Sequence, residues 1–126
     1  MSEAKTYTIK RSEWNAYRAS GLSPSNMSLL YNPKYEDFCC VGIMCKAEGV
    51  SVEALSGKGY PRAVLAADPL NEQKIPDFML EDRQNNSWLI YRAVHVNDAP
   101  RYSPIEKEAL LTQLFAEHNI TLIFED

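Results

Sequence analysis

The apolar residues of this chain fall into short blocks, some alternating with polar residues and others recurring at helical spacing. Residues 6–10 alternate, with Tyr7 and Ile9 on one side, and predict a first strand. Residues 120–124 predict a last strand, and residues 27–31 predict a short one that the turn at Asn32 and Pro33 closes. The pattern therefore indicates strands near both ends of the sequence.

Residues 88–96 give the strongest strand signal in the sequence. This run is rich in aromatic and β-branched residues and is interrupted only by Arg92, Ala93 and His95, which is typical of a buried strand. We expect it to be the central strand of the sheet.

The first predicted helix follows Ser12, whose side chain is placed to cap it. Trp14 and Tyr17 would share one face of this amphipathic helix, and Gly21 is placed to end it in the left-handed conformation.

A second helix is predicted over residues 38–48, with Asp37 as its N-cap and Gly49 at its end. Apolar residues surround it on nearly all sides, and Lys46 and Glu48 are its main polar residues. Because a helix that is apolar all round is buried, we expect it to be the central helix, with Gly42 permitting close packing.

The clearest helix start in the sequence is Ser103. Glu106 stands three residues later and completes a capping box, while Pro104 takes the first helical position, where a missing N–H does no harm. This C-terminal helix ends near Asn119, and Ser51 is placed to cap one further short turn. The apolar stripe of the C-terminal helix consists of Leu110, Leu111, Leu114 and Phe115.

Together these elements predict one small α+β domain over residues 1–126. A mixed or antiparallel sheet would pack on the buried central helix and on the C-terminal amphipathic helix. A chain of 126 residues buries roughly two thirds of its unfolded surface, which is enough for one core. The apolar fraction of 45% and the charged fraction of 24% are those of an average globular domain.

The chain carries 17 acidic and 13 basic residues, a net charge of −4. Proteins that hold nucleic acid by its phosphates need a clustered basic surface, so direct nucleic-acid binding is not expected. The sequence has no apolar run of the roughly 18 residues that a membrane span requires, and residues 1–5 lack the apolar core of a signal peptide. We therefore expect a cytoplasmic protein that does not enter a membrane.

Three cysteines, Cys39, Cys40 and Cys45, are the first candidates for chemistry. Their odd number and close spacing do not resemble a secreted disulfide framework, so reduced thiols are expected. The start of the predicted helix would favour a reactive thiolate at Cys39 and Cys40. Against this, Glu36 and Asp37 add negative charge beside the same sulfurs, and free cysteine is usually buried. The core interpretation is the stronger one.

No metal, cofactor or catalytic set is predicted. His95 or His118 could join the cysteines in a zinc site, but the cysteine spacing is not a recurring zinc pattern. The stretch at residues 56–59 is too short for a phosphate-binding loop and has no strand before it. The sequence therefore favours a binding protein over an enzyme.

The segment over residues 57–86 has the least regular pattern, with Pro61, Pro69 and Pro76 interrupting any long element. Binding groups concentrate on loops that a rigid scaffold holds. We therefore predict the recognition surface here, with the turn at residues 97–102 as second choice. The expected contacts are Arg62, Phe78 and Tyr102. Phe78 belongs to a small acidic and apolar patch, whose residues are Asp77, Phe78, Met79, Leu80, Glu81 and Asp82.

Three blocks of the sequence resemble a group of uncharacterised proteins from phages and prophages. Residues 12–21, with Trp14 and the Arg18-Ala19-Ser20-Gly21 ending, are similar to the Trp and Leu-Arg-Ser-Gly opening of that group, although Ala19 replaces its usual arginine. Residues 38–45 resemble its Cys-Cys-Leu-Gly-Val-Leu-Cys block, and residues 96–103 resemble its Leu-Asn-Asp ending. The resemblance implies a small phage-type protein in the bacterial host cytoplasm and supplies no catalytic residues.

Three functions remain open. The first is a phage accessory protein that binds and inhibits a host defence, CRISPR or transcription protein without catalysis. The second is a sponge that sequesters a nucleotide immune signal, and the third is an enzyme that depends on Cys39 and Cys40. The oligomeric state is left open. Residues suited to stacking a base or holding phosphates in a sponge are Tyr60, Arg62, Trp88, Tyr91, Arg92, Arg101 and Tyr102.

Overall fold

The first strand of the chain pairs with the last. β1 (Lys5–Lys10) and β4 (Ile120–Glu125) run parallel, in a register that pairs Tyr7 with Leu122. Tyr7, Ile9, Ile120 and Leu122 are buried, while the residues between them lie at least partly exposed. The predicted strands at residues 6–10 and 120–124 are thus confirmed, and their apolar faces point into the core.

The computed structural model describes residues 4–17, 29–80 and 89–126. A second small sheet joins β2 (Tyr31–Asn32) to β3 (Asp37–Phe38) in antiparallel order. The predicted α+β class is confirmed. Instead of one mixed or antiparallel sheet, the described residues form two two-stranded sheets. The expected strand over residues 27–31 is reduced to Tyr31–Asn32, and residues 27 and 28 lie outside the described ranges.

The predicted central helix is α1 (Cys40–Ala47), and it is buried from Cys40 to Cys45. Its N-cap is Cys39, not Asp37, because Asp37 pairs with Asn32 in the small sheet. The turn after α1 contains Gly49 with φ +100°, which supports the predicted termination.

Residues 88–96 do not form the predicted central strand. They belong to helix α4 (Leu89–Asp98), and Trp88 lies outside the described residues. The buried side chains of α4 recur every four residues on one side of the helix, which is helical spacing. This spacing outweighs the β propensity of individual residues, which is strongly context-dependent. The buried residues are Leu89, Ile90, Ala93, Val94, Asn97 and Asp98.

The C-terminal helix is α5 (Pro104–Ala116). Its predicted capping box between Ser103 and Glu106 is present, with Pro104 in the first turn. The helix ends three residues before Asn119, which takes a positive φ of 63° in the turn to β4. Lys107, Leu111 and Phe115 are the residues that α5 buries.

As far as Tyr17, the chain after Ser12 forms η1 (Asn15–Tyr17), a 3-10 helix, where an amphipathic α-helix was predicted, and residues 18–20 of that prediction lie outside the described residues. Gly21 lies outside the described residues. Ser51 caps α2 (Val52–Leu55), as predicted.

The segment after residue 57 is more ordered than its prolines suggest. α3 (Pro61–Ala67), η2 (Pro69–Gln73) and η3 (Asp77–Met79) follow one another up to residue 80. The prolines Pro61, Pro69 and Pro76 stand at the start of these helices, where a missing N–H costs nothing. The prolines begin short helices, none of them longer than 7 residues. The expectation that no long element forms here agrees with this, while the expectation of an irregular loop is wrong for residues 61–67, 69–73 and 77–79.

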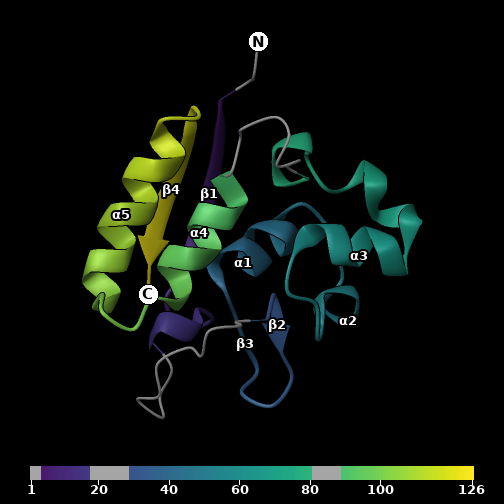
Figure 1. Ribbon diagram of the computed structural model, residues 1–126, viewed down its shortest axis with the longest axis horizontal. Coiled ribbons are helices and arrows are strands. Elements are labelled where there is room, and N and C mark those ends of the chain that lie inside the picture. Colours follow the sequence, from purple (N-terminus) through teal and green to yellow (C-terminus); the bar gives the residue numbers. More distant parts are fainter. Residues whose placement is uncertain (1–3, 18–28, 81–88) are drawn as a thin grey trace.

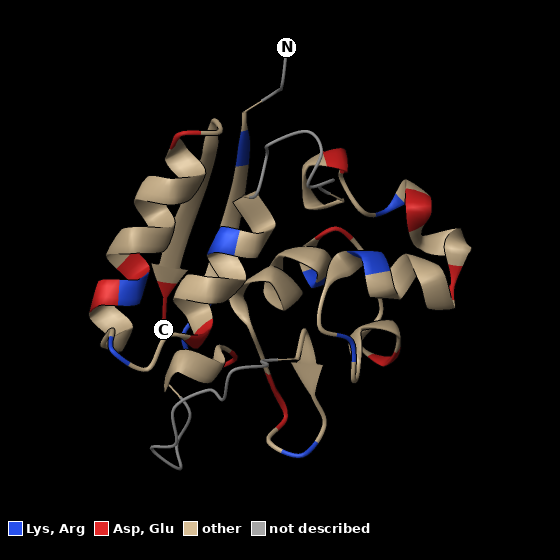
Figure 2. Cartoon of the chain, in the orientation of Figure 1, with Lys and Arg blue, Asp and Glu red and all other residues tan. Residues whose placement is uncertain are grey.

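Figure 1 shows α5 lying against β4, with α1 at the centre of the molecule. α1 also packs against β1, and α4 packs against both α1 and α5. α2 and α3 lie at the opposite end from α5. Acidic and basic residues alternate over the chain in Figure 2 and do not segregate to one end. Within residues 4–17, 29–80 and 89–126, none of the helices has the length and apolar character needed to cross a membrane.

Candidate functional site

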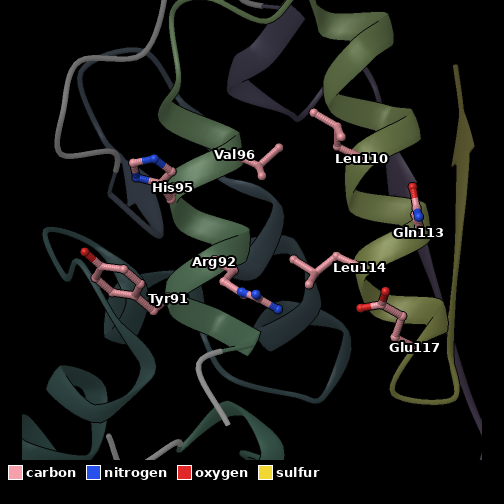
Figure 3. A pocket seen from close by; sticks show the side chains of 8 residues that line it. All are labelled: Tyr91, Arg92, His95, Val96, Leu110, Gln113, Leu114 and Glu117. Atoms are coloured by element: carbon pink, nitrogen blue, oxygen red, sulfur yellow. The ribbon is translucent and has the colours of Figure 1, made fainter. Parts of the chain in front are cut away.

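The outer face of α4 is exposed and carries aromatic and basic side chains. Since this helix buries one side, it turns Tyr91, Arg92 and His95 outward. Tyr91 is 46% exposed. Figure 3 shows Tyr91 and His95 projecting from one side of α4, while Arg92 and Val96 project from the side that faces α5. We call Tyr91, Arg92 and His95 the α4 ridge.

A groove of about 350 Å³ runs along one side of the ridge, between α4 and α5. Leu110 and Leu114 project from α5 toward α4 and, with Val96, form its apolar floor (Figure 3). Arg92 and Glu117 place opposite charges on its two sides. We call this the α4–α5 groove, and its full lining is Tyr91, Arg92, His95, Val96, Leu110, Gln113, Leu114 and Glu117.

A second hollow, of about 430 Å³, lies on the other side of the ridge. It is bounded by the C-terminal end of α4, by the turn that follows and by Tyr60, which precedes α3 and is 48% exposed. We call it the α4 end hollow. Tyr91 and His95 line both depressions, so the ridge separates two adjoining cavities of ligand-binding size. The lining of the hollow is Tyr60, Tyr91, Val94, His95, Asp98, Ala99, Pro100 and Arg101.

The exposed charged residues that line the two depressions are Arg92, Arg101 and Glu117. The guanidinium of Arg101 lies 4.9 Å from the ring centre of Tyr102, a cation–π contact that orients it. The carboxylate of Asp98 is buried and acts on the ammonium of Lys107, which is itself only 3% exposed. Desolvation lowers the pKa of Lys107, and the charge of Asp98 opposes that shift. The negative charge of Asp98 is therefore partly neutralised by the buried ammonium of Lys107. The side chains of Arg92 and Arg101 are exposed.

The position of α4 is fixed by Asn97. Its Oδ1 accepts hydrogen bonds from the Trp14 indole Nε1 at 2.6 Å and from the Cys40 backbone N–H at 3.1 Å. Its Nδ2 donates to Asn15 Oδ1 at 3.0 Å, and its carbonyl accepts from Lys107 Nζ at 2.8 Å. Among the described residues, every buried side-chain nitrogen and oxygen has a hydrogen-bond partner. The network is a structural support that holds the ridge in place.

The three cysteines lie in the core. Each is at most 1% exposed, and burial raises the pKa of Cys39 and of Cys45 to about 12. Burial also raises the pKa of Cys40 well above its usual value. Since the thiolate is the reactive form, these thiols are poor nucleophiles, which counts against a cysteine-dependent enzyme.

The two histidines considered for a zinc site that the sequence disfavours, His95 and His118, are both exposed, unlike the buried thiols. Over residues 4–17, 29–80 and 89–126, no group of three or more His, Cys, Asp or Glu side chains is arranged to hold a metal ion.

The three predicted contact residues lie in two places. Arg62 is exposed on α3 and donates from Nη2 to the carbonyl of Leu80 at 2.8 Å. Phe78 is half-buried and meets the ring of Tyr7 edge-on, with the ring centres 6.3 Å apart. Tyr102 is half-buried in the turn between α4 and α5. Helix α4 thus separates Tyr102 along the chain from the other two, and these residues do not line either depression.

The predicted acidic and apolar patch is only partly a surface feature. Met79, near its centre, is 2% exposed and packs into the core. Cys45 Sγ lies 3.6 Å from the sulfur of Met79. Asp77 is exposed, and Glu81 and Asp82 lie outside the described residues.

The sequence interpretation missed the ridge and its groove because it assigned residues 88–96 to a buried strand with no exposed face. The spacing of Leu89, Ala93 and Asn97 was the available signal, since residues four apart share one side of a helix. Four residues proposed for a nucleotide sponge do lie on this surface, namely Tyr60, Tyr91, Arg92 and Arg101.

The sequence matches no protein-family model, and comparison with curated proteins and with solved structures gave no match. The function is therefore argued from the geometry of the α4 ridge and the two depressions beside it.

Proposed function

We propose that this chain is a phage-type accessory protein that binds and inhibits a host defence, CRISPR or transcription protein without catalysis. The observation that carries the proposal is the α4 ridge, an exposed tyrosine, arginine and histidine set between two depressions. The ridge and depressions supply the contact surface, and inhibition follows when they cover a working surface of the partner.

The residue types of the surface support a protein partner. Tyrosine and arginine are enriched among the residues that contribute most to protein–protein binding, and lysine is depleted at interface centres. Tyr60, Tyr91, Arg92 and Arg101 all line the two depressions, and lysine lines neither. A rigid scaffold below the ridge reduces the entropy lost on binding.

The three blocks that resemble phage proteins contribute residues to the buried network below the ridge, and none of the three ridge residues. Each block supplies one residue to this network, namely Trp14, Cys40 and Asn97 in chain order. The α4 ridge and Tyr60 lie outside the three blocks and are available to supply binding specificity. A phage-type protein would act in the bacterial host cytoplasm, a reducing compartment compatible with three free, buried cysteines.

Affinity capture from bacterial lysate, followed by native mass measurement, tests this function. The double variant Tyr91→Ala, Arg92→Ala should capture the partner at least about tenfold less, which corresponds to about 1.4 kcal/mol. The matched control is Leu70→Ala, an exposed apolar residue on η2. Equal capture by the double variant and the wild type would refute the assignment of the ridge.

A second candidate, the nucleotide sponge, has one observation in its favour. Tyr60, Tyr91 and Arg101 surround the α4 end hollow, where the rings could stack on a base and the guanidinium could hold a phosphate. A thermal-shift series with cyclic and linear nucleotides tests it, because a ligand that binds only the folded state raises the melting temperature. Tyr60→Ala, which alters only this hollow, should abolish the shift. Unchanged melting at millimolar nucleotide would remove this candidate.

A further inference from the structure

We infer that the α4–α5 groove receives an amphipathic helix of the partner protein, with acidic residues along the flank that faces α4. This inference rests on the proposed function and names the partner's binding element. Its basis is the apolar floor of Val96, Leu110 and Leu114 and the charged groups that border it.

A helix fits this groove better than a strand. Both walls are helices, whose backbone N–H and C=O groups are hydrogen-bonded within α4 and α5. A strand entering the groove would find side chains only and would leave its own backbone groups without partners, which is costly in an apolar setting. A helix brings its backbone groups already paired, so that only its side chains need to match the floor.

The length of the groove sets the spacing of the partner's apolar residues. Its α5 wall extends from Leu110 to Glu117, which corresponds to about 10 Å at 1.5 Å per residue. Two turns of a partner helix cover that length. The partner should therefore present apolar side chains at positions i, i+3 or i+4, and i+7, the pattern by which helices occupy such grooves.

The charges that border the groove are not symmetric. Arg92, the sole Lys or Arg of α4 and the blue band on that helix in Figure 2, borders the α4 side. Glu117 borders the α5 side. Complementary charges fix orientation and exclude wrong partners. The matching helix carries Asp or Glu opposite Arg92 and a basic or neutral residue opposite Glu117.

A displayed library of helix-forming peptides tests the inference on the full chain. Each peptide of about 20 residues carries the apolar stripe, while its two flanks vary freely among acidic, basic and amide residues. The library is selected against the wild type. Individual peptides are then measured by fluorescence anisotropy against Leu110→Glu, Arg92→Glu and Lys34→Glu. Leu110 lines the groove and does not belong to the hydrophobic cluster of the core, so its replacement removes no core side chain.

The expected result is an enriched pool with acidic residues on one flank. Such peptides should lose at least about tenfold in affinity, or 1.4 kcal/mol, for both Leu110→Glu and Arg92→Glu. Lys34→Glu makes the same change in net charge as Arg92→Glu, in the exposed turn between β2 and β3, and should bind as the wild type does. Melting temperatures of all three variants verify folding, and Arg92→Glu, at an exposed position, keeps the test valid if Leu110→Glu unfolds.

Several outcomes overturn the inference. They are a selection that yields no binder, an enriched pool with basic flanks, or binders that Leu110→Glu retains. A dimer in sedimentation equilibrium that Leu110→Glu dissolves would assign the groove to a second copy of this chain. If any of these is found while Tyr91→Ala, Arg92→Ala still abolishes partner capture, the proposed function stands and the inference about the groove fails.

Discussion

The indole Nε1 of Trp14 donates a buried hydrogen bond of 2.6 Å to Oδ1 of Asn97, across 83 positions of the sequence. The same oxygen accepts the backbone N–H of Cys40, so one amide joins η1, α1 and α4. An apolar residue at position 97 would leave both donors buried without an acceptor.

Replacement of Asn97 by Leu should therefore lower the free energy of unfolding by about 3–5 kcal/mol. Each buried donor left unsatisfied costs about 1–3 kcal/mol, and the bond from Nδ2 to Asn15 is lost as well. Urea denaturation measures the change. His95→Ala, an exposed position on the same helix, should stay within about 0.5 kcal/mol of the wild type. Equal midpoints for the two variants would show that the network contributes nothing.

Gly42 lies against the backbone of Leu30, and Gly42→Ala should destabilise strongly. A methyl group there would stand 1.9 Å from the Leu30 carbonyl oxygen, which belongs to the backbone and cannot rotate away. We expect a loss of at least about 3 kcal/mol, at the upper end of overpacking costs. The control is Gly59→Ala, where the added methyl meets nothing within 4 Å. That variant should be neutral or more stable by about 0.5 kcal/mol.

Phe78 and Arg62 were both predicted as contact residues, but their surroundings predict that replacement by alanine lowers the stability by different amounts. Phe78 packs against the core and against Tyr7, so Phe78→Ala should cost about 2–3 kcal/mol of stability. Arg62 is exposed, and Arg62→Ala should cost less than about 1 kcal/mol. Thermal melting and partner capture are measured on the same samples. Together they distinguish a residue that stabilises the core from one that contacts the partner. Loss of capture per folded molecule in Phe78→Ala would restore it as a contact residue.

The buried thiols predict a loss of stability at alkaline pH. Their pKa is raised by burial, to about 12 for Cys39 and Cys45, against about 8.5 in an unfolded chain. A raised folded pKa means that the unfolded state releases protons first. The stabilisation is thus complete below about pH 8.5 and declines as the pH rises toward 12. Cys40, whose pKa is also raised by burial, contributes to the same decline.

Urea titrations at pH 9 and 10 measure this decline. Cys40→Ala removes one such thiol and should reduce the slope by up to about 1.4 kcal/mol per pH unit. An unchanged slope in Cys40→Ala would mean that this thiol ionises as readily in the folded protein as in the unfolded chain.

The lowered pKa of Glu108 predicts a loss of stability at acidic pH. Arg11 donates two hydrogen bonds of 2.9 Å to it, and these, with a hydrogen bond from the Tyr17 hydroxyl, lower the pKa of Glu108 despite its partial burial. A lowered folded pKa gives stability that is present above the unfolded pKa of about 4.3 and is lost as the pH falls further. Glu108→Gln should flatten this acid limb in denaturation curves between pH 5 and 3. Glu72→Gln, an exposed position in η2, is the control and should keep the wild-type curve.

The sequence predicted correctly those helix and strand positions that depend on residues close together along the chain. Ser103, Pro104 and Glu106 fixed the start of α5 because capping depends on residues three apart. Tyr7 and Ile9 indicated β1 because alternation needs no distant partner. Asp37 was a plausible N-cap by type, but its pairing with Asn32 moved the start of α1 to Cys39 and Cys40.

The candidate site was less predictable, because it depends on packing between α4 and α5. Val96 and Leu114 are 18 positions apart and meet only after both helices have formed. The strand assignment for residues 88–96 removed one of those helices, and with it the groove. Tyr60, Tyr91 and Arg101 were recognised by residue type, yet their grouping in one hollow required the folded chain.

The pairing of β1 with β4 also determines when this domain can fold during its synthesis. The strand partner of Lys5 is Ile120, so β1 stays without its partner until residue 120 has been made. At about 5–20 residues per second, that interval is about 6–23 seconds. Pairing between such distant segments is intrinsically slow. Ribosome-bound chains that stop short of residue 120 therefore lack the sheet on which α5 lies, and this sheet is completed only after β4 has been made.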